Sequence, residues 1–318
     1  MENFFKSALD DPDLQLKLRE DGNIFFLHLL GCDTNGHVHK PHSQQYRDNV
    51  NSVDEGIGRV VSVVEKYFRH DGRTAYIMTA DHGMTDWGSH GTGMDQETVT
   101  PLVLWGAGIS QLEQSSGARP RFDSWSGLET GPRLEVDQAD LAPLMASLLA
   151  RPIPVNSMGR LPITVLDLHP NHKVQWPSPC SRGFHYFLFQ VEAMLGQVDQ
   201  LLAQYLALQK IHSRVRLPKV FHHPYPNLSD SDIGGRKTEV RNVAKQGHFK
   251  EALRLCDSFI DTIMEGIEYY QRYQKSILLI LIKMSFIGCA ITNLAKLCSN
   301  GKKTNSGNAE MLSNATRY

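Results

Sequence analysis

Three short segments rich in aspartate and histidine constrain this chain more than any other feature. They are residues 33–37 (DTNGH), residues 80–84 (ADHGM) and residues 89–91 (SHG). Aspartate oxygens and histidine nitrogens are the usual protein ligands of zinc and similar divalent ions. The segments supply five such side chains, which are more than one ion needs: Asp33, His37, Asp81, His82 and His90. The sequence therefore predicts a two-metal site suited to phosphoryl chemistry.

Apolar runs precede the first two of these segments. Residues 23–30 (NIFFLHLL) are nearly all apolar, which predicts a strand covered on both faces in a parallel sheet, with a buried helix turn as the alternative. Residues 31–40 are polar and predict a loop. From Ser43 to Phe68, apolar residues recur at spacings of three and four, which predicts an amphipathic helix. Residues 74–79 predict the next strand.

This order of strand, helix and strand predicts a right-handed βαβ unit. Because ligands in open α/β sheets bind at the carboxyl edge of the strands, both ligand segments are expected to meet there. Residues 101–105 predict a third strand, residues 106–136 a surface excursion, and residues 141–150 a helix capped by Asp140. We expect an α/β fold with a mostly parallel sheet flanked by helices and a helical C-terminal portion.

The second half of the chain has a different character. Prolines interrupt residues 152–179, and helical periodicity follows over residues 186–211 and 242–273, with a loop at 222–236 between them. We expect this helical pair to pack on the α/β domain, and a separate binding module is the alternative. The expected division is a partial catalytic domain over 1–165, loops and the helical pair over 166–275, and the tail described next.

Residues 276–293 are the one candidate for a membrane span. They have the minimum length, but Lys283 near their centre costs about 3 kcal/mol on insertion scales. A buried helix is the equally weighted alternative. Residues 294–318 form a polar tail, which we expect to be disordered from residue 299 onward.

Charge and cysteine content exclude several classes of protein. The net charge of −1 gives no basic surface for nucleic acid. Five widely spaced cysteines without a CxxC pair indicate neither a zinc ribbon nor a disulfide scaffold. Asn227 and Asn314 lie in glycosylation sequons. Residues 1–20 contain no signal-peptide pattern, and we expect the chain to begin in mid-domain.

Longer motifs carry a family resemblance. The order D-x-x-x-H, then A-D-H-G-M, then G-S-H-G resembles the alkaline phosphatase superfamily. Within it, six segments resemble the GPI ethanolamine phosphate transferases over roughly residues 1–272: HLLGCDTNGHVHKPHS, MTADHGMTDWGSHG, TPLVLWGAGI, QADLAPLMASLL, PIPVNSMGRLP and NHKVQW.

This resemblance implies a fold, a metal site and an activity. It implies an alkaline-phosphatase-like sheet, one metal held by Asp33, His37 and His90, and a second held by Asp81 and His82. The ions would be two divalent cations, Zn²⁺ or alternatively Mn²⁺. The implied reaction transfers phosphoethanolamine from phosphatidylethanolamine to a mannose of the GPI precursor. The implied location is the endoplasmic reticulum membrane, with the catalytic domain in the lumen.

The sequence also departs from the family pattern. The family's Thr or Ser nucleophile and a companion Asp have no counterpart upstream of Asp33. We therefore expect a fold that is incomplete at the N-terminus, and a chain that is inactive alone. Two alternatives stay open: another metal-dependent phosphohydrolase, sulfatase or phosphomutase of the superfamily, and a non-catalytic membrane-associated fragment.

Overall fold

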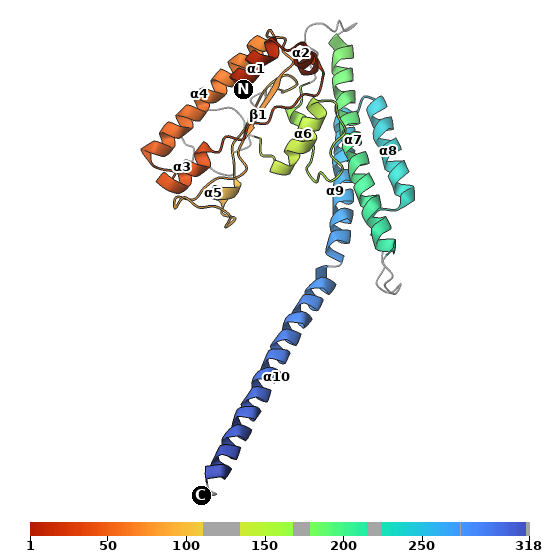
Figure 1. The fold of residues 1–318 in the computed structure, drawn as a ribbon. Helices are drawn as coiled ribbons and strands as arrows, with labels where there is room; N and C mark the ends of the chain where they lie inside the picture. Colours follow the sequence, from red (N-terminus) through yellow and green to blue (C-terminus); the bar gives the residue numbers. More distant parts are fainter. Residues whose placement is uncertain (111–133, 168–178, 215–223, 274, 316–318) are drawn as a thin grey trace. The chain divides into compact units, whose positions relative to one another are not determined.

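The computed structural model describes residues 1–110, 134–167, 179–214, 224–273 and 275–315 (Figure 1). They divide into two compact units. The first comprises Met1–Leu201 and Gly234–Ile260, and the second Leu202–Ile233 and Asp261–Tyr318. Each unit is described by itself.

The first unit begins with two short helices, α1 (Glu2–Leu9) and α2 (Pro12–Arg19). Asp11 caps α2, because its carboxylate accepts the backbone N–H groups of Asp13 and Leu14, each at 3.0 Å. Both helices pack on α4 or on each other around a small apolar cluster of Phe5, Ala8, Leu18 and Val64.

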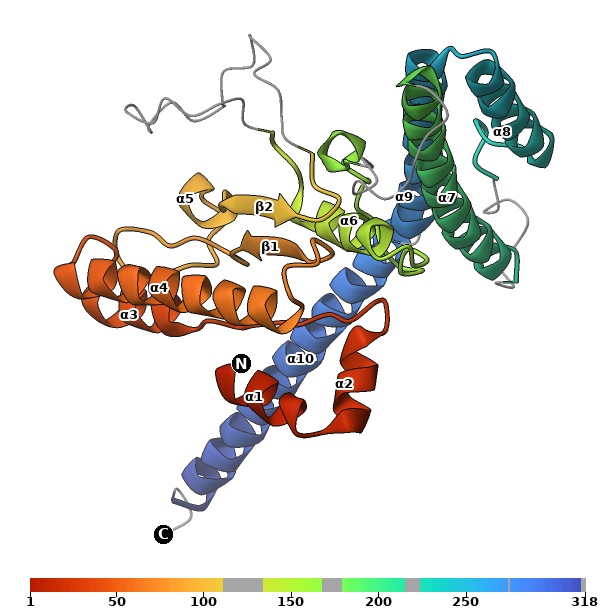
Figure 2. The same ribbon diagram turned by 90° about the horizontal axis from the view of Figure 1, so that it is seen from above.

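Helix α4 (Gln44–Tyr67) confirms the helix predicted from Ser43 to Phe68. It begins where the sequence indicated, because the Ser43 hydroxyl accepts the N–H of Tyr46 at 3.1 Å. Helix α3 (Gly31–His39) lies alongside it (Figure 2). The loop predicted for residues 31–40 is therefore wrong, and the metal-ligand motif lies on a helix.

The strand predicted for residues 23–30 is also wrong. This segment forms neither a strand nor a helix, and its side chains are exposed, Phe26 at 85%. Continuous hydrophobicity indicates that burial of a segment is favourable, but a strand also requires a neighbouring strand to complete its backbone hydrogen bonds. No strand pairs with these residues in the part of the chain that the structure describes.

The remaining strand predictions hold to within one residue. Strand β1 (Ala75–Thr79) pairs with β2 (Leu102–Gly106), and Tyr76 stacks on Trp105 with ring centroids 5.0 Å apart. The pairing is antiparallel, with Ala75 opposite Gly106 and Thr79 opposite Leu102. The βαβ unit is not present among the described residues, because residues 23–30 form no strand there. The sheet that these residues do form is antiparallel rather than parallel, and the chain returns from β1 to β2 through α5 (Asp95–Thr98).

A 3₁₀ turn, η1 (Gln138–Asp140), leads into α6 (Leu141–Leu148), which confirms the helix predicted there. Asp140 stands at the N-cap position, but it does not cap this helix through its side chain. Its carboxylate instead accepts the backbone N–H groups of Asp137 at 3.1 Å and Arg160 at 2.6 Å. The carboxylate therefore ties η1 to the chain that precedes η2 (Ile163–Val165).

The long helices differ from prediction in where they break. Helix α7 (Pro179–Arg214) contains the predicted residues 186–211, whereas the predicted helix 242–273 is divided between α8 (Asp230–Lys245) and α9 (Phe249–Tyr273). Gly247, at φ +84°, ends α8, and the N–H groups of Gly247 and His248 bond back to the carbonyls of Ala244 and Val243. Part of the loop predicted at 222–236 is thus the first turns of α8.

Within the first unit, α7 is joined to the loop before η2 by buried Gln197. Its amide donates to the Gly159 carbonyl at 2.6 Å and accepts the Leu161 N–H at 2.9 Å. Within the second unit, tyrosine hydroxyls form hydrogen bonds between segments that are distant in sequence. Tyr205 donates to the Leu228 carbonyl at 3.3 Å, and Tyr225 donates to Glu265 at 2.8 Å.

Helix α10 (Lys275–Ala315) extends beyond the predicted membrane segment. Disorder from residue 299 is therefore wrong as far as Ala315, and residues 316–318 lie outside the described residues. Among the residues described, Leu278–Leu297 alone is long and apolar enough to cross a membrane, with a mean hydropathy of 1.9 and no burial. Most of the excursion predicted at 106–136 is likewise not described.

Candidate metal centre

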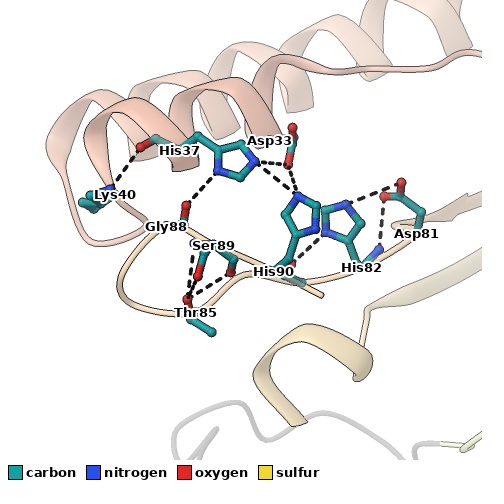
Figure 3. A network of polar contacts seen from close by, with 10 residues as sticks. Asp33, His37, Lys40, Asp81, His82, Thr85, Gly88, Ser89 and His90 are labelled. Carbon is teal, nitrogen blue, oxygen red and sulfur yellow. Dashed lines mark hydrogen bonds and ion pairs between the residues drawn. The ribbon is translucent and has the colours of Figure 1, made fainter. Parts of the chain in front are cut away.

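Helix α3 places Asp33 and His37 on one face, because residues four apart in a helix lie one above the other. Nε2 of His37 lies 3.4 Å from Oδ1 of Asp33. His90 arrives from the loop after β1, and its Nε2 lies 3.5 Å from the same Asp33 oxygen (Figure 3). The structure thus brings together three of the five predicted ligands.

A turn between Thr85 and Gly88 sets the position of His90. The Gly88 N–H bonds to the Thr85 carbonyl at 2.8 Å, and the Thr85 hydroxyl donates to the Ser89 carbonyl at 2.9 Å. Thr85 is only 2% exposed, so the turn is anchored beneath the surface. His90 follows directly and points at α3 (Figure 3).

The spacing of the three ligand atoms suits a tetrahedral ion. Nε2 of His37 and Nε2 of His90 are 3.2 Å apart, and each lies 3.4–3.5 Å from Asp33 Oδ1. Bonds of about 2.0–2.1 Å in tetrahedral geometry separate neighbouring ligands by about 3.3 Å. Three protein ligands leave a fourth position open, which is the pattern of catalytic rather than structural zinc sites.

The contacts of the three residues direct their ligand atoms toward one another, and Nε2 of His37 lies at hydrogen-bond distance from Nε2 of His90. Nδ1 of His37 lies 2.7 Å from the Gly88 carbonyl, which can only accept, so Nδ1 carries the proton and Nε2 presents a lone pair. Asp33 Oδ1 is buried and has no hydrogen-bond partner. A buried carboxylate oxygen without a partner is costly unless a cation satisfies it. The residues therefore fit a divalent ion.

Asp81 and His82 lie beside this cluster but are arranged differently. The His82 ring stacks on the His90 ring with centroids 3.8 Å apart. Nδ1 of His82 bonds to the Gly83 carbonyl at 2.8 Å, which again leaves Nε2 free. The Asp81 side chain is 80% exposed, and its carboxylate lies 3.7 Å from His82 Nε2. The structure therefore places these two predicted ligands beside the cluster but outside the group of three converging ligand atoms.

Small residues in the motifs allow the close approach of these segments. A Cβ at Gly88 would lie 2.5 Å from the Gly36 carbonyl, and one at Gly83 would lie 2.1 Å from the Gln96 carbonyl. Gly88 also has φ +72°, a conformation that favours glycine. At Gly36, a Cβ would meet the Met84 sulfur at 2.4 Å. The glycines therefore let α3, α5 and the ligand loop pack closely.

Sequence reasoning missed two residues that hold the loop. Gln138 donates to the carbonyls of Ala80 and Asp81, at 3.0 and 2.8 Å. Glu97 is 2% exposed and accepts hydrogen bonds from Thr92, Gly93 and Met94. Burial alone would raise the pKa of the Glu97 carboxyl, but these hydrogen bonds outweigh it and lower the pKa. The only sequence signal is a glycine-rich turn, whose N–H groups need an acceptor.

Other sequence candidates lie apart from the cluster's ligand atoms. Burial raises the pKa of the Cys32 thiol, which disfavours a thiolate beside Asp33. Asn227 is exposed, and its amide bonds to the Tyr225 hydroxyl at 3.3 Å. Asn314 lies in the last turn of α10.

Comparison with known proteins agrees with the family resemblance. Residues 1–107 match the family model described as "Type I phosphodiesterase / nucleotide pyrophosphatase". The chain is 40% identical over 292 residues to GPI ethanolamine phosphate transferase 1 of Mus musculus, 38% over 293 residues to that of Homo sapiens and 35% over 294 residues to that of Gibberella zeae. No solved structure matches the chain.

The aligned region covers 91% of this chain, but only 28–29% of these three relatives. Percentages of this size over nearly 300 residues establish common ancestry for the aligned part, and they confirm the resemblance carried by the motifs. The chain is therefore homologous, over nearly all of its length, to part of the GPI ethanolamine phosphate transferase 1 sequences of animals and fungi.

Proposed function

We propose that this chain forms the metal-binding part of an ethanolamine phosphate transferase acting in GPI-anchor biosynthesis. The observation that carries the proposal is the triangle of Asp33, His37 and His90, whose ligand atoms lie 3.2–3.5 Å apart. One of these atoms, Oδ1 of Asp33, is buried and has no hydrogen-bond partner. The proposed fold is alkaline-phosphatase-like, on the strength of the family match over residues 1–107.

Two divalent cations are proposed. Asp33, His37 and His90 would hold the first, and Asp81 and His82 would contribute to the second. Imidazole ligands and a spacing near that of a tetrahedron favour Zn²⁺, with Mn²⁺ as the alternative. When bound, such ions neutralise phosphoryl oxygens and polarise the attacking and leaving oxygens.

The chain's own residues prepare this site in two ways. The Gly88 carbonyl keeps the proton of His37 on Nδ1, so that Nε2 faces the ion. The Gly83 carbonyl does the same for His82. Hydrogen bonds from the ring nitrogen that does not bind the ion fix both the tautomer and the ring orientation before the metal binds.

The proposed substrates are phosphatidylethanolamine as donor and a mannosylated GPI precursor lipid as acceptor. Transfer through a covalent intermediate requires an activated Ser or Thr hydroxyl. We assign that role to no residue that the structure describes, because the cluster beside Thr34, the hydroxyl nearest Asp33 in sequence, contains Asp33 as its one carboxylate. The 318 residues alone are therefore expected to bind metal without transferring phosphoethanolamine.

We place the protein at the endoplasmic reticulum membrane, with α10 as a span and the catalytic part in the lumen. The span is supported by the exposed apolar surface of Leu278–Leu297. The hydroxyls of Ser285 and Thr292 bond to carbonyls of their own helix, at 2.9 and 2.7 Å, so neither is left unsatisfied in lipid. A luminal position would expose Asn227 to glycosylation, and loss of an endoglycosidase-sensitive shift in Asn227→Gln would test it.

The proposed activity is testable by a chimera. Residues 1–272 would replace the aligned segment of the mouse relative, in cells that lack that enzyme. Restored GPI-anchored surface proteins are the expected result, and the chimera carrying Asp33→Ala should fail to restore them. A chimera that works equally well with Asp33→Ala would overturn the proposal, and immunoblotting for equal expression is the control.

A second candidate is a phosphodiester hydrolase, and the name of the matching family model favours it. The two candidates differ in the acceptor, which is water for a hydrolase and a mannose hydroxyl for a transferase. A chimera that releases free phosphoethanolamine without forming phosphoethanolamine-modified GPI precursor would favour hydrolysis.

A further inference from the structure

We propose that Glu97 is a positioning residue, which holds the segment that carries Asp81 and His82 to the turn that follows His90 and thereby sets the geometry of the metal site. The inference rests on the proposed function, because it concerns the same site. It adds a residue that belongs to neither ligand group and touches no ligand atom.

The Glu97 carboxylate gathers the turn that follows His90. It accepts the backbone N–H of Thr92 at 2.7 Å, the Thr92 hydroxyl at 2.9 Å, the N–H of Gly93 at 2.7 Å and, more weakly, that of Met94 at 3.4 Å. The side chain is 2% exposed. Four donors therefore converge on one ionised group shielded from water, which makes these hydrogen bonds strong.

The backbone of the same residue holds the segment that carries Asp81 and His82. The Glu97 carbonyl accepts the N–H of Gly83 at 2.6 Å, and Gly83 directly follows Asp81 and His82. The approach is so close that a Cβ on Gly83 would lie 2.1 Å from the neighbouring Gln96 carbonyl. Glu97 thus bonds to Thr92, two residues after His90, through its carboxylate and to Gly83, the residue after His82, through its backbone carbonyl.

The turn after His90 has little else to define it. Gly91 and Gly93 have φ of +98° and +83°, and a Cβ on either would meet no atom within 4 Å. Glycines in open space are conformationally free. The position of His90 therefore depends on the turn before it, between Thr85 and Gly88, and on the Glu97 carboxylate that binds the turn after it.

The test compares Glu97→Gln with the native chain, both full-length. Glutamine keeps the size of the side chain but turns an amide N–H₂ toward backbone donors. Substitution of a residue that holds metal ligands in place typically costs about 10–100-fold in metal affinity, and we expect that loss for Zn²⁺ and Co²⁺ by titration calorimetry. The visible absorption spectrum of bound Co²⁺ should also change, because the ligand geometry changes. Glu65→Gln is the matched control, since Glu65 accepts from Tyr76 at 2.8 Å, away from both loops.

A metal-free measurement separates this inference from the proposed function. In the apo-protein, amide hydrogen exchange at Gly83, Thr92 and Gly93 should quicken together in Glu97→Gln while helix α4 stays protected. That result supports the inference even if native chain binds no metal, which would refute only the proposed metal site. Unchanged exchange at these amides, or unchanged affinity and Co²⁺ spectrum, would overturn it. If Glu97→Gln unfolds, Thr92→Val decides by the same readouts, because it deletes one hydrogen bond only.

Discussion

The cluster of Asp33, His37 and His90 and the pair of Asp81 and His82 use the same residue types in different surroundings. The cluster has a buried carboxylate oxygen facing two imidazole nitrogens at 3.4–3.5 Å. In the pair, the carboxylate is 80% exposed and lies 3.7 Å from one imidazole. Both histidines with a bonded Nδ1, His37 and His82, present Nε2.

This difference shows that ligand identity alone does not make a metal site. The cluster is preorganised, because its unsatisfied oxygen and lone pairs already incur a cost that an ion would relieve. The pair exposes its carboxylate to water, which must be displaced before an ion can bind. We therefore expect one strong and one weak equivalent of metal.

The largest expected effect is that of Asp33→Ala. This change removes the one oxygen shared by both histidines of the cluster, so we expect the affinity of the strong equivalent to fall by more than about 100-fold. Titration calorimetry and metal analysis of purified chain would measure it. Asp199→Ala is a suitable control, because exposed Asp199 pairs with Lys237 and not with the cluster. Native affinity in Asp33→Ala would break the comparison.

The ligands of the cluster were predictable from sequence, but their supports were not. Asp and His at short spacing are rarely placed together without a polar or metallic partner, so the motif is visible in the residues themselves. Glu97 resembles any surface glutamate in sequence, since its role arises from a turn that folds over it. Gly88 is recognisable as a turn residue, but not as the source of the carbonyl that orients His37.

The fold was predictable in part, for a related reason. Periodicity predicted α4 because an amphipathic helix satisfies its own backbone and shows its buried face in the sequence. Residues 23–30 are more continuously apolar than α4. The partner of a strand, however, lies elsewhere in a chain or complex, so the sequence of the strand itself does not identify it. The polarity of residues 31–40 and the presence of Gly36 suggested a loop, whereas packing on α4 stabilises a helix there.

Gly88→Ala should have the next largest effect. A side chain at φ +72° costs about 1–2 kcal/mol, and the added Cβ would lie 2.5 Å from the Gly36 carbonyl. The turn must shift, which removes the acceptor for His37 Nδ1. We expect a loss of about 10–100-fold in affinity at the strong site. Gly91→Ala has a similar φ but open space, so a loss equal to that of Gly88→Ala would contradict this explanation.

Asp81→Ala should separate the pair from the cluster, because we expect it to leave metal binding by the cluster nearly unchanged. The exposed carboxylate belongs to the pair alone, so we expect the weak equivalent to disappear while the affinity of the strong site changes by less than about threefold, roughly 0.6 kcal/mol. Stoichiometry from calorimetry would fall from two metals per chain to one. Simultaneous loss of both equivalents would show that the two groups act as one site.

The smallest expected effect is a pH dependence of the free energy of unfolding that arises from Glu97. The pKa of the Glu97 carboxyl is lower in the folded protein than its ordinary value of 4.5, because hydrogen bonds from Thr92, Gly93 and Met94 outweigh burial. The unfolded chain therefore binds the proton more readily than the folded one. The stabilisation is complete above about pH 5 and is lost as the pH falls through the lowered pKa of the folded state.

Urea unfolding of metal-free protein at about pH 5.5 and about pH 3.5 would measure this loss of stability. Native protein should lose more free energy of unfolding over this range than Glu97→Gln does, because the variant has no such carboxyl to protonate. Equal losses would mean that the carboxylate holds the turn no more tightly in the folded protein than water does in the unfolded chain, and the strong site would then owe its geometry to α3 and the Gly88 turn alone.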